Sequence, residues 1–422
     1  MHFIIQGVKI IDPTSPFNQL VKDIRIHNGR IIEIDDRLHG ADDEDIFDFT
    51  GKFVSPGWFD MMASFGDPGH EHKETIQSGA NAATYGGFTS VCLMPNTIPA
   101  LHSKSEIEYI INRSKSELIN IYPYGAITKK REGSELTEIY DMHHAGAIAF
   151  TDADVAVNDG GILMRSLLYV KPFGGVIINI PNNHSEVGNA SVNEGNMSVQ
   201  LGMYGIPEVL EEIMVIRDIK LAEYTQSKLH LGIISSAASL NHIREAKNKG
   251  IHVTAGVSAY QIYFDESELH DYNTNYKVNP PLRTKQDVEA IKAGLKDGTI
   301  DVICSYHLPH ESDVKDVEFE NAAFGMESIE ATFGAANSML KEMMSIEEII
   351  NKIAINPRKI LNIAIPSIDK NNLAELTIFD GSTEWQFGKE HLKGRSNNTG
   401  FTGKTLNGKP LAIINKSRIK IL

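Results

Sequence analysis

The sequence predicts an α/β protein in which a (β/α)8 TIM-like barrel is joined to a small β-sandwich domain formed from both termini. Three observations predict it: short apolar runs recur eight times between residues 53 and 306, helix-like stretches separate most of them, and strand-like segments occupy both ends. The length of 422 residues suits one large domain plus a smaller one. We expect residues 1–52 and 369–422 to form the β domain and residues 53–368 to form the barrel.

The two ends of the chain show the alternation of apolar and polar residues that is typical of short antiparallel strands. At the N-terminal end these segments are residues 3–5, 8–11, 24–26 and 31–34. At the C-terminal end they are residues 376–379 and 411–414, with Gly and Asn turns around them. Similar material at both ends predicts one β domain to which each terminus contributes.

The middle of the chain supplies the eight predicted barrel strands. They are residues 53–62, 89–94, 119–125, 147–150, 175–180, 229–234, 251–257 and 301–306. Residues 207–225 open with Pro207, which we place at the first helical position, and residues 240–246 and 284–295 are also helix-like. Ser345 and Glu348 form the signature of a capping box. In such a barrel the chemistry lies at the C-terminal ends of the strands.

Composition excludes several classes of partner. Hydrophobic residues make up 41% of the chain and charged residues 23%, as in soluble globular proteins. The net charge of −15 disfavours nucleic acid and anionic membranes. Cys92 and Cys304 lie in apolar runs and are expected to be buried thiols. Residues 1–6 lack the pattern of a secretory signal, and no 18-residue apolar span occurs, so we expect a cytoplasmic protein.

The segment after the first predicted strand carries a recognisable motif. Residues 60–69 read Asp-Met-Met-Ala-Ser-Phe-Gly-Asp-Pro-Gly. This segment resembles the first metal-binding motif of dihydroorotases of the amidohydrolase superfamily, Asp-x-His-x-His-x-Arg-(Asp/Glu)-Pro-Gly. Further segments resemble this family in register: residues 73–75, 86–89, 94–97, 125–129, 193–195, 276–283, 319–325 and 397–403. The resemblance covers nearly the whole chain and implies a barrel of the amidohydrolase type, which in this family holds zinc.

The resemblance assigns the family's metal-ligand positions to six residues of this chain, and most of them are not metal ligands. In chain order these residues are Met62, Ser64, Asp152, Pro181, Ile233 and Tyr306. Zinc requires about three or four N, S or O ligands. A thioether, a proline and an aliphatic side chain offer none suited to zinc, and a tyrosine coordinates only as a phenolate with an ordinary pKa near 10. Asp152 is the one candidate ligand that remains, so we expect no zinc and no other cofactor.

Three retained residues match family positions that line the substrate pocket: Asn96, Asn279 and His310. Tyr306 stands at the position of the family's acid/base aspartate, where a phenol is a poor replacement near neutral pH. Gly66 replaces the arginine that clamps the substrate carboxylate. The asparagines also lie in good turn-forming sequences, and His310 has a loop-bracing role as its alternative, so both interpretations stay open.

Three functions remain. The first is a catalytically inactive dihydroorotase homologue that acts as a structural partner of aspartate transcarbamoylase, the partner that the resemblance implies together with a homodimer. The second is an active hydrolase of dihydroorotate or another cyclic amide with a rebuilt site. The third is a small-molecule sensor that uses the old pocket. We favour the first because the losses fall on the metal positions while the scaffold motifs persist.

Overall fold

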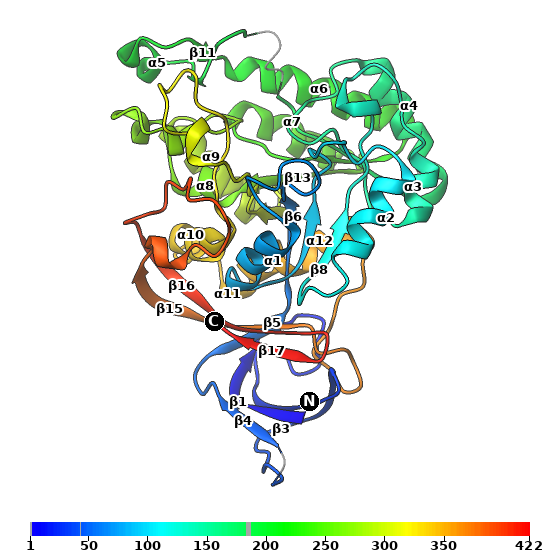
Figure 1. Ribbon diagram of the computed structural model, residues 1–422, viewed down its shortest axis with the longest axis vertical. Coiled ribbons are helices and arrows are strands. Elements are labelled where there is room, and N and C mark those ends of the chain that lie inside the picture. The colour runs from blue at the N-terminus through cyan, green and yellow to red at the C-terminus, as the bar shows by residue number, and fades with distance from the viewer. Residues whose placement is uncertain (1, 43, 183–186) are drawn as a thin grey trace.

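The computed structural model describes residues 2–42, 44–182 and 187–422, and it contains a barrel above a β-sandwich domain to which both termini contribute (Figure 1). The predicted fold class is therefore confirmed. Among the described residues, no helix is long and apolar enough to cross a membrane.

The barrel is formed by parallel strands. One set is β6 (Trp58–Ala63), β7 (Phe88–Leu93) and β8 (Asn120–Pro123), and the other is β9 (Val176–Asn179), β12 (Lys228–Leu231), β13 (Val253–Ser258) and β14 (Val302–Cys304). Single parallel bridges of Phe150 to Gly125 and to Ile177 join the two sets on one side. A bridge between Ala63 and His307 closes the ring on the other. The predicted fourth strand is thus reduced to bridges at Phe150.

The first predicted strand, residues 53–62, is two strands. It is divided at Gly57 into β5 (Phe53–Pro56) and β6. β5 pairs with β1 and with β15, so these four residues belong to the terminal sheet and not to the barrel. A Cβ atom at Gly57 would lie 2.1 Å from the Thr89 hydroxyl, so a residue without a side chain is required where the chain passes between the two sheets.

The terminal sheet has the order β17-β16-β15-β5-β1-β2-β3, with β4 paired to β1. Its other strands are β1 (His2–Ile10), β2 (Val21–His27), β3 (Arg30–Asp35), β4 (Asp45–Asp48), β15 (Leu376–Gln386), β16 (Thr405–Asn415) and β17 (Arg418–Ile421). Side chains from both ends of the chain share one apolar core, in which Phe3 and Ile24 pack with Leu376 and Ile414.

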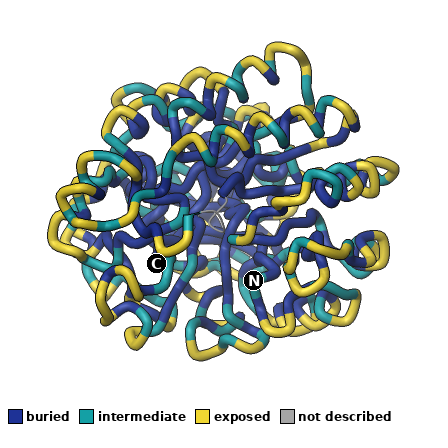
Figure 2. Tube along the Cα trace, turned by 90° about the horizontal axis from the view of Figure 1, so that it is seen from above, coloured by how far each residue is buried: buried dark blue, intermediate teal, exposed yellow. Residues whose placement is uncertain are grey.

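Helices surround the barrel strands, and Figure 2 shows the buried core at the centre with exposed residues on the outer turns. The α-helices are α1 (Ile76–Tyr85), α2 (Lys104–Arg113), α3 (Ile139–Ala145), α4 (Gly160–Val170), α5 (Asn196–Leu201), α6 (Glu208–Thr225), α7 (Ala237–Asn248), α8 (Ala259–Tyr263), α9 (Lys285–Asp297), α10 (Thr332–Leu340), α11 (Ile346–Ile350) and α12 (Asn356–Ile360). Two short strands, β10 (Val192–Asn193) and β11 (Gly205–Ile206), precede α6. The capping box of Ser345 and Glu348 is present, whereas Pro207 is the N-cap of α6 rather than its first helical residue.

Candidate functional site at the barrel mouth

Apolar side chains fill the mouth of the barrel at positions that the family resemblance assigns to metal ligands. Met62 and Ile233 are fully buried, and Pro181 is also buried. A Cβ atom at Gly232 would lie 3.0 Å from Ile180 Cγ1 and 3.2 Å from Met62 Cε. The Met62 thioether therefore packs against the end of β12 and acts as a core side chain.

Ser64, at the position of the second histidine, is held by two neighbours. Its backbone N–H donates to the His307 carbonyl oxygen at 2.8 Å, and its hydroxyl accepts from Asn96 Nδ2 at 2.9 Å. Two predicted site residues thus meet here. The Asn96 Oδ1 atom is buried and has no hydrogen-bond partner among the described residues. The contact joins the loop after β7 to the end of β6.

Gly66 leaves no room for the arginine of the family motif. A Cβ atom at this position would lie 2.1 Å from the His70 carbonyl oxygen and 2.9 Å from the Glu74 carbonyl oxygen. The turn is closed by the His70 N–H, which donates to the Gly66 carbonyl oxygen at 2.6 Å. A carboxylate clamp at residue 66 therefore requires a different path of the backbone.

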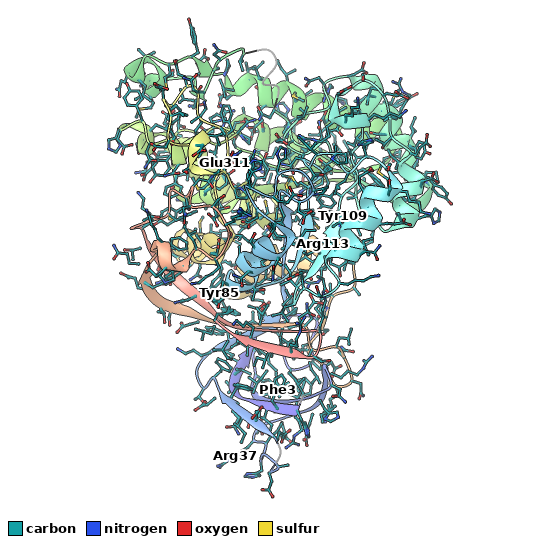
Figure 3. The ribbon with its side chains drawn as sticks, in the orientation of Figure 1. Phe3, Arg37, Tyr85, Tyr109, Arg113 and Glu311 are labelled. Carbon is teal, nitrogen blue, oxygen red and sulfur yellow. The ribbon has the colours of Figure 1, made fainter. Side chains whose placement is uncertain are left out.

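The retained motif residues Asp60 and Asp67 serve the scaffold. Asp60 is fully buried and accepts the Ser305 backbone N–H at 2.8 Å and the Ser305 hydroxyl, which ties β6 to the end of β14. Burial raises the pKa of the Asp60 carboxyl, while the Ser305 hydrogen bonds oppose this rise. Asp67 accepts the Tyr109 hydroxyl at 2.8 Å and lies 3.9 Å from the Arg113 guanidinium; both partners project from α2 (Figure 3).

Asp152, the remaining candidate metal ligand, is committed to its own neighbourhood. One carboxylate oxygen accepts the Thr128 backbone N–H at 3.0 Å and the other accepts the Thr128 hydroxyl. Burial raises the pKa of the Asp152 carboxyl, opposed by these hydrogen bonds. Across the ranges that the structure describes, no group of three or more His, Cys, Asp or Glu residues is arranged to hold a metal ion.

Tyr306 is also unsuited to the family chemistry. It is almost fully buried, and burial raises the pKa of its phenol well above the ordinary value, with the neighbouring Tyr260 adding to the rise. The phenol is therefore protonated at neutral pH and provides neither a metal-binding phenolate nor a general base. Together with Met62, Pro181 and Ile233, it gives a donor set that does not fit zinc.

His310 is braced through both its backbone and its ring. The backbone N–H donates to Asn398 Oδ1 at 2.8 Å, and ring Nε2 lies 2.9 Å from the Phe324 carbonyl oxygen, so Nε2 carries the proton. Burial lowers the pKa of the ring to about 4, so it is neutral near pH 7. The buried Nδ1 then offers only a lone pair, which does not bind a carboxylate. Asn279 precedes Pro280, and its buried Oδ1 has no partner among the described residues.

The chain is similar to known proteins over nearly its whole length. A family model described as Dihydro-orotase-like matches residues 51–239. A protein named dihydroorotase from Carboxydothermus hydrogenoformans is 39% identical over 395 residues, covering 93% of this chain and 92% of its own. Another from Syntrophus aciditrophicus is 35% identical over 422 residues, with 99% of each chain covered. The chain belongs to the dihydroorotase family.

Solved structures of low sequence identity share the fold of this dihydroorotase-family chain. L-hydantoinase (dihydropyrimidinase) from Arthrobacter aurescens matches with a TM-score of 0.87 at 18% identity, covering 100% of this chain and 97% of that one. A D-hydantoinase matches with a TM-score of 0.83 at 21% identity, covering 100% and 95%. At these identities the likeness concerns the fold alone, a barrel with a β-sandwich domain.

The other motifs shared with the dihydroorotase family meet one another as braces. Arg283 donates from Nη1 to Asn193 Oδ1 at 2.7 Å and from Nε to the Ser235 hydroxyl at 3.0 Å, so two motifs hold the segment after β12. Lys277 Nζ donates to the carbonyl oxygens of Phe319 and Glu320, both at 2.8 Å. These contacts give the motif residues a bracing role in the fold.

Sequence reasoning missed a buried cluster beside the mouth, formed by Glu74, Glu327, Glu330 and His307. His307 Nδ1 accepts the Ser328 N–H at 3.3 Å, so Nε2 carries the proton, 3.7 Å from Glu74 Oε2. Neither Glu327 oxygen has a partner among the described residues, and burial raises the pKa of that carboxyl well above its usual range. The signal in the sequence was the pair of acids inside the apolar stretch of residues 326–333.

A cavity of about 640 Å³ lies beside His310 rather than over Met62. Polar loop residues line it, from residues 272–275, 310–317 and 395–398 together with His72. His72 Nε2 lies 3.5 Å from Glu311 Oε1. Glu311 is labelled in Figure 3. His230 is buried on β12, and its ring Nδ1 lies 2.9 Å from the Thr254 hydroxyl oxygen of β13.

Proposed function

We propose that this chain is a catalytically inactive dihydroorotase homologue of pyrimidine biosynthesis that acts as a structural partner of aspartate transcarbamoylase. The observation that carries the proposal is the packing of Met62 and Ile180 against Gly232, where the family requires metal ligands. Hydrolysis of a cyclic amide in this family depends on metal ions that polarise the carbonyl group and acidify a water. The side chains at the mouth do neither.

The carboxylates that remain near the mouth support the same conclusion. The carboxylate oxygens of Asp60 accept hydrogen bonds from Ser305, and those of Asp152 accept hydrogen bonds from Thr128. Burial raises the pKa of both carboxyls. Recruiting either one for catalysis breaks a hydrogen bond that holds two barrel segments together. Such a break costs about 1–3 kcal/mol for each buried group left unsatisfied.

The choice of a protein partner rests on what is retained. The motif residues Asp67, Asn193, Lys277, Arg283 and Asn398 all hold loops of the scaffold in place. A chain that keeps the residues bracing its fold but lacks the metal ligands can act by binding another protein. Family analogy supplies aspartate transcarbamoylase as that partner.

An active dihydroorotase is the second candidate, and the comparisons favour it. Relatives named dihydroorotase match at 35% and 39% identity over at least 93% of this chain. Activity then requires a rebuilt site, and the buried acids beside His307 are candidate groups for it. The sensor function is the third candidate, supported by the polar cavity beside His310.

Co-expression with the aspartate transcarbamoylase of the same organism tests the main proposal. We expect the two chains to elute together in size-exclusion chromatography and carbamoyl transfer to change when this chain is present. A stable complex of this kind buries about 1,200 Å² or more. Separate elution with unchanged transfer contradicts the partnership. Hydrolysis of dihydroorotate by the purified chain supports the second candidate instead.

A further inference from the structure

A cavity of about 430 Å³ lies at the end of the barrel opposite the mouth. It lies against the first residues of β9, β12 and β13, and α12 forms its other side. The barrel strands are parallel, and β6 enters the barrel directly from β5 of the terminal sheet, so these first residues mark the end of the barrel next to that sheet. Pockets that bind small molecules have volumes of about 300–1,000 Å³. We call this space the base cavity.

Hydrogen bonds at both ends of α12 fix this helix beside the strand ends. At its start, Asn356 Nδ2 donates to the Asp301 carbonyl oxygen at 2.9 Å, just before β14. Beyond its end, Asn362 Oδ1 accepts from Lys228 Nζ at 3.1 Å, and Asn362 Nδ2 donates to the Gly174 carbonyl oxygen at 3.3 Å. The base cavity lies between these two attachments, so its shape is set by the fold itself.

Aliphatic side chains form much of the wall of the base cavity. Val176, Leu229 and Val253 are buried and come from three neighbouring strands. Ile251 and Ile360 are half-buried and complete the apolar part of the wall. None of the described residues that line the cavity is Phe, Tyr or Trp. The wall therefore suits an aliphatic body better than a flat ring system that requires stacking on an aromatic side chain.

Basic side chains also line the base cavity. Lys228, His252 and Lys359 are exposed there, and Lys359 makes no hydrogen bond or ion pair with any described residue. Lys228 donates to a neutral amide, so its charge is not offset. Asp301 is the one acid among the described lining residues, and its Oδ2 accepts from Lys247 Nζ at 2.6 Å. The base cavity therefore favours an anion, although the whole chain has a net charge of −15.

We propose that the base cavity binds a small organic anion with an aliphatic body, of the class of medium-chain carboxylates and alkyl phosphates. The body packs against Leu229, Val253 and Ile360, and the headgroup accepts charge-assisted hydrogen bonds from Lys359 and Lys228. A lysine ammonium group acts on either headgroup as a point charge with three donors, so the two share one chemistry of recognition. The base cavity lies at the opposite end of the barrel from the mouth, so the inference does not depend on the proposed function.

Isothermal titration calorimetry of the full chain at low ionic strength tests the ligand class, with octanoate and octyl phosphate as probes. We expect one molecule per chain of at least one of these anions, with a dissociation constant below about 1 mM. The tighter of the two identifies the headgroup. Octan-1-ol keeps the body without the charge, and acetate and inorganic phosphate keep the charge without the body. These three should bind at least about tenfold more weakly, since each lacks one of the two contacts. No binding of either octyl anion, or equally tight binding of any of the three controls, overturns the proposal.

Charge reversal at Lys359 tests where the anion binds. Lys359 is exposed and has no partner among the described residues, so we expect Lys359→Glu to fold, as circular dichroism can check. The variant should raise the dissociation constant of the octyl anion about tenfold, because an attraction becomes a repulsion. Lys285→Glu is the matched control: Lys285 is exposed at the start of α9, does not line the base cavity, and should leave the constant unchanged. An unchanged constant in Lys359→Glu, or an equal rise in Lys285→Glu, overturns the proposal.

Discussion

Met62 stands where the family has a metal ligand, and its substitution by alanine measures what the side chain does here. The thioether is fully buried and lies against the end of β12. Truncation of a buried methionine to alanine costs about 2–5 kcal/mol when the neighbours do not collapse into the space. We expect Met62→Ala to fall in that range.

Gly232→Ala probes the same contact from the other side. The added methyl group lies 3.0 Å from Ile180 Cγ1 and 3.2 Å from Met62 Cε, which is tighter than ordinary packing. Overpacking of this kind costs about 1–3 kcal/mol. In the double variant Met62→Ala/Gly232→Ala, the thioether is absent and the new methyl group occupies part of the space. The double variant should therefore lose about 1–2 kcal/mol less stability than the sum of the losses in the two single variants.

Urea unfolding followed by tryptophan fluorescence provides the assay, because Trp58 is buried in β6, the strand that also carries Met62. Gly160→Ala is the matched control: its Cβ atom meets nothing closer than 3.9 Å, and we expect no loss of stability. The reasoning is refuted if Met62→Ala costs less than about 0.5 kcal/mol, the range of ordinary surface substitutions. Strictly additive costs refute the contact with residue 232.

Three further predictions concern the titratable groups and the lost ligands. Burial raises the pKa of the Glu327 carboxyl in the folded protein, so its contribution to stability is complete below its pKa in the unfolded chain and is lost as pH rises through its pKa in the folded protein. As pH rises, the free energy of unfolding of the wild type should therefore fall relative to that of Glu327→Gln, by at most about 1.4 kcal/mol per pH unit. A difference between the two proteins that does not change with pH contradicts this prediction. Asp152→Asn should lower stability by about 1–3 kcal/mol in urea titrations, because one acceptor of Thr128 is lost; an unchanged midpoint contradicts the bracing role. Single reversions should give no dihydroorotase turnover in a spectroscopic assay, since catalytic residues act as a unit, and turnover in any one of them shows the site to be less dismantled. The reversions are Met62→His, Ser64→His, Ile233→His and Tyr306→Asp.

The barrel was predictable because buried parallel strands leave short apolar runs at regular spacing. The exceptions have tertiary causes. β5 joins the terminal sheet because its partners are β1 and β15, and the latter lies more than 300 residues away in sequence. The fourth strand pairs only at Phe150, which no local pattern distinguishes from a full strand.

The residue types at positions 62, 181 and 233 lead to the prediction that zinc is not bound here, but the contacts made by the neighbouring site residues could not be predicted from the sequence. The role of Asp60 was hidden because its partner, Ser305, is 245 residues away. Likewise, the proton on His310 is fixed by the Phe324 carbonyl oxygen.

The central claim is that the barrel mouth holds no catalytic metal, and elemental analysis joined to an activity assay tests it most directly. The chain is purified without chelator, with the relative from Carboxydothermus hydrogenoformans prepared alongside as the reference for the assay. We predict no stoichiometric zinc and no interconversion of dihydroorotate and carbamoyl aspartate, with or without added zinc. Stoichiometric zinc that is lost in Asp152→Asn, with turnover of about 1 s⁻¹ or more as in typical enzymes, would contradict the account.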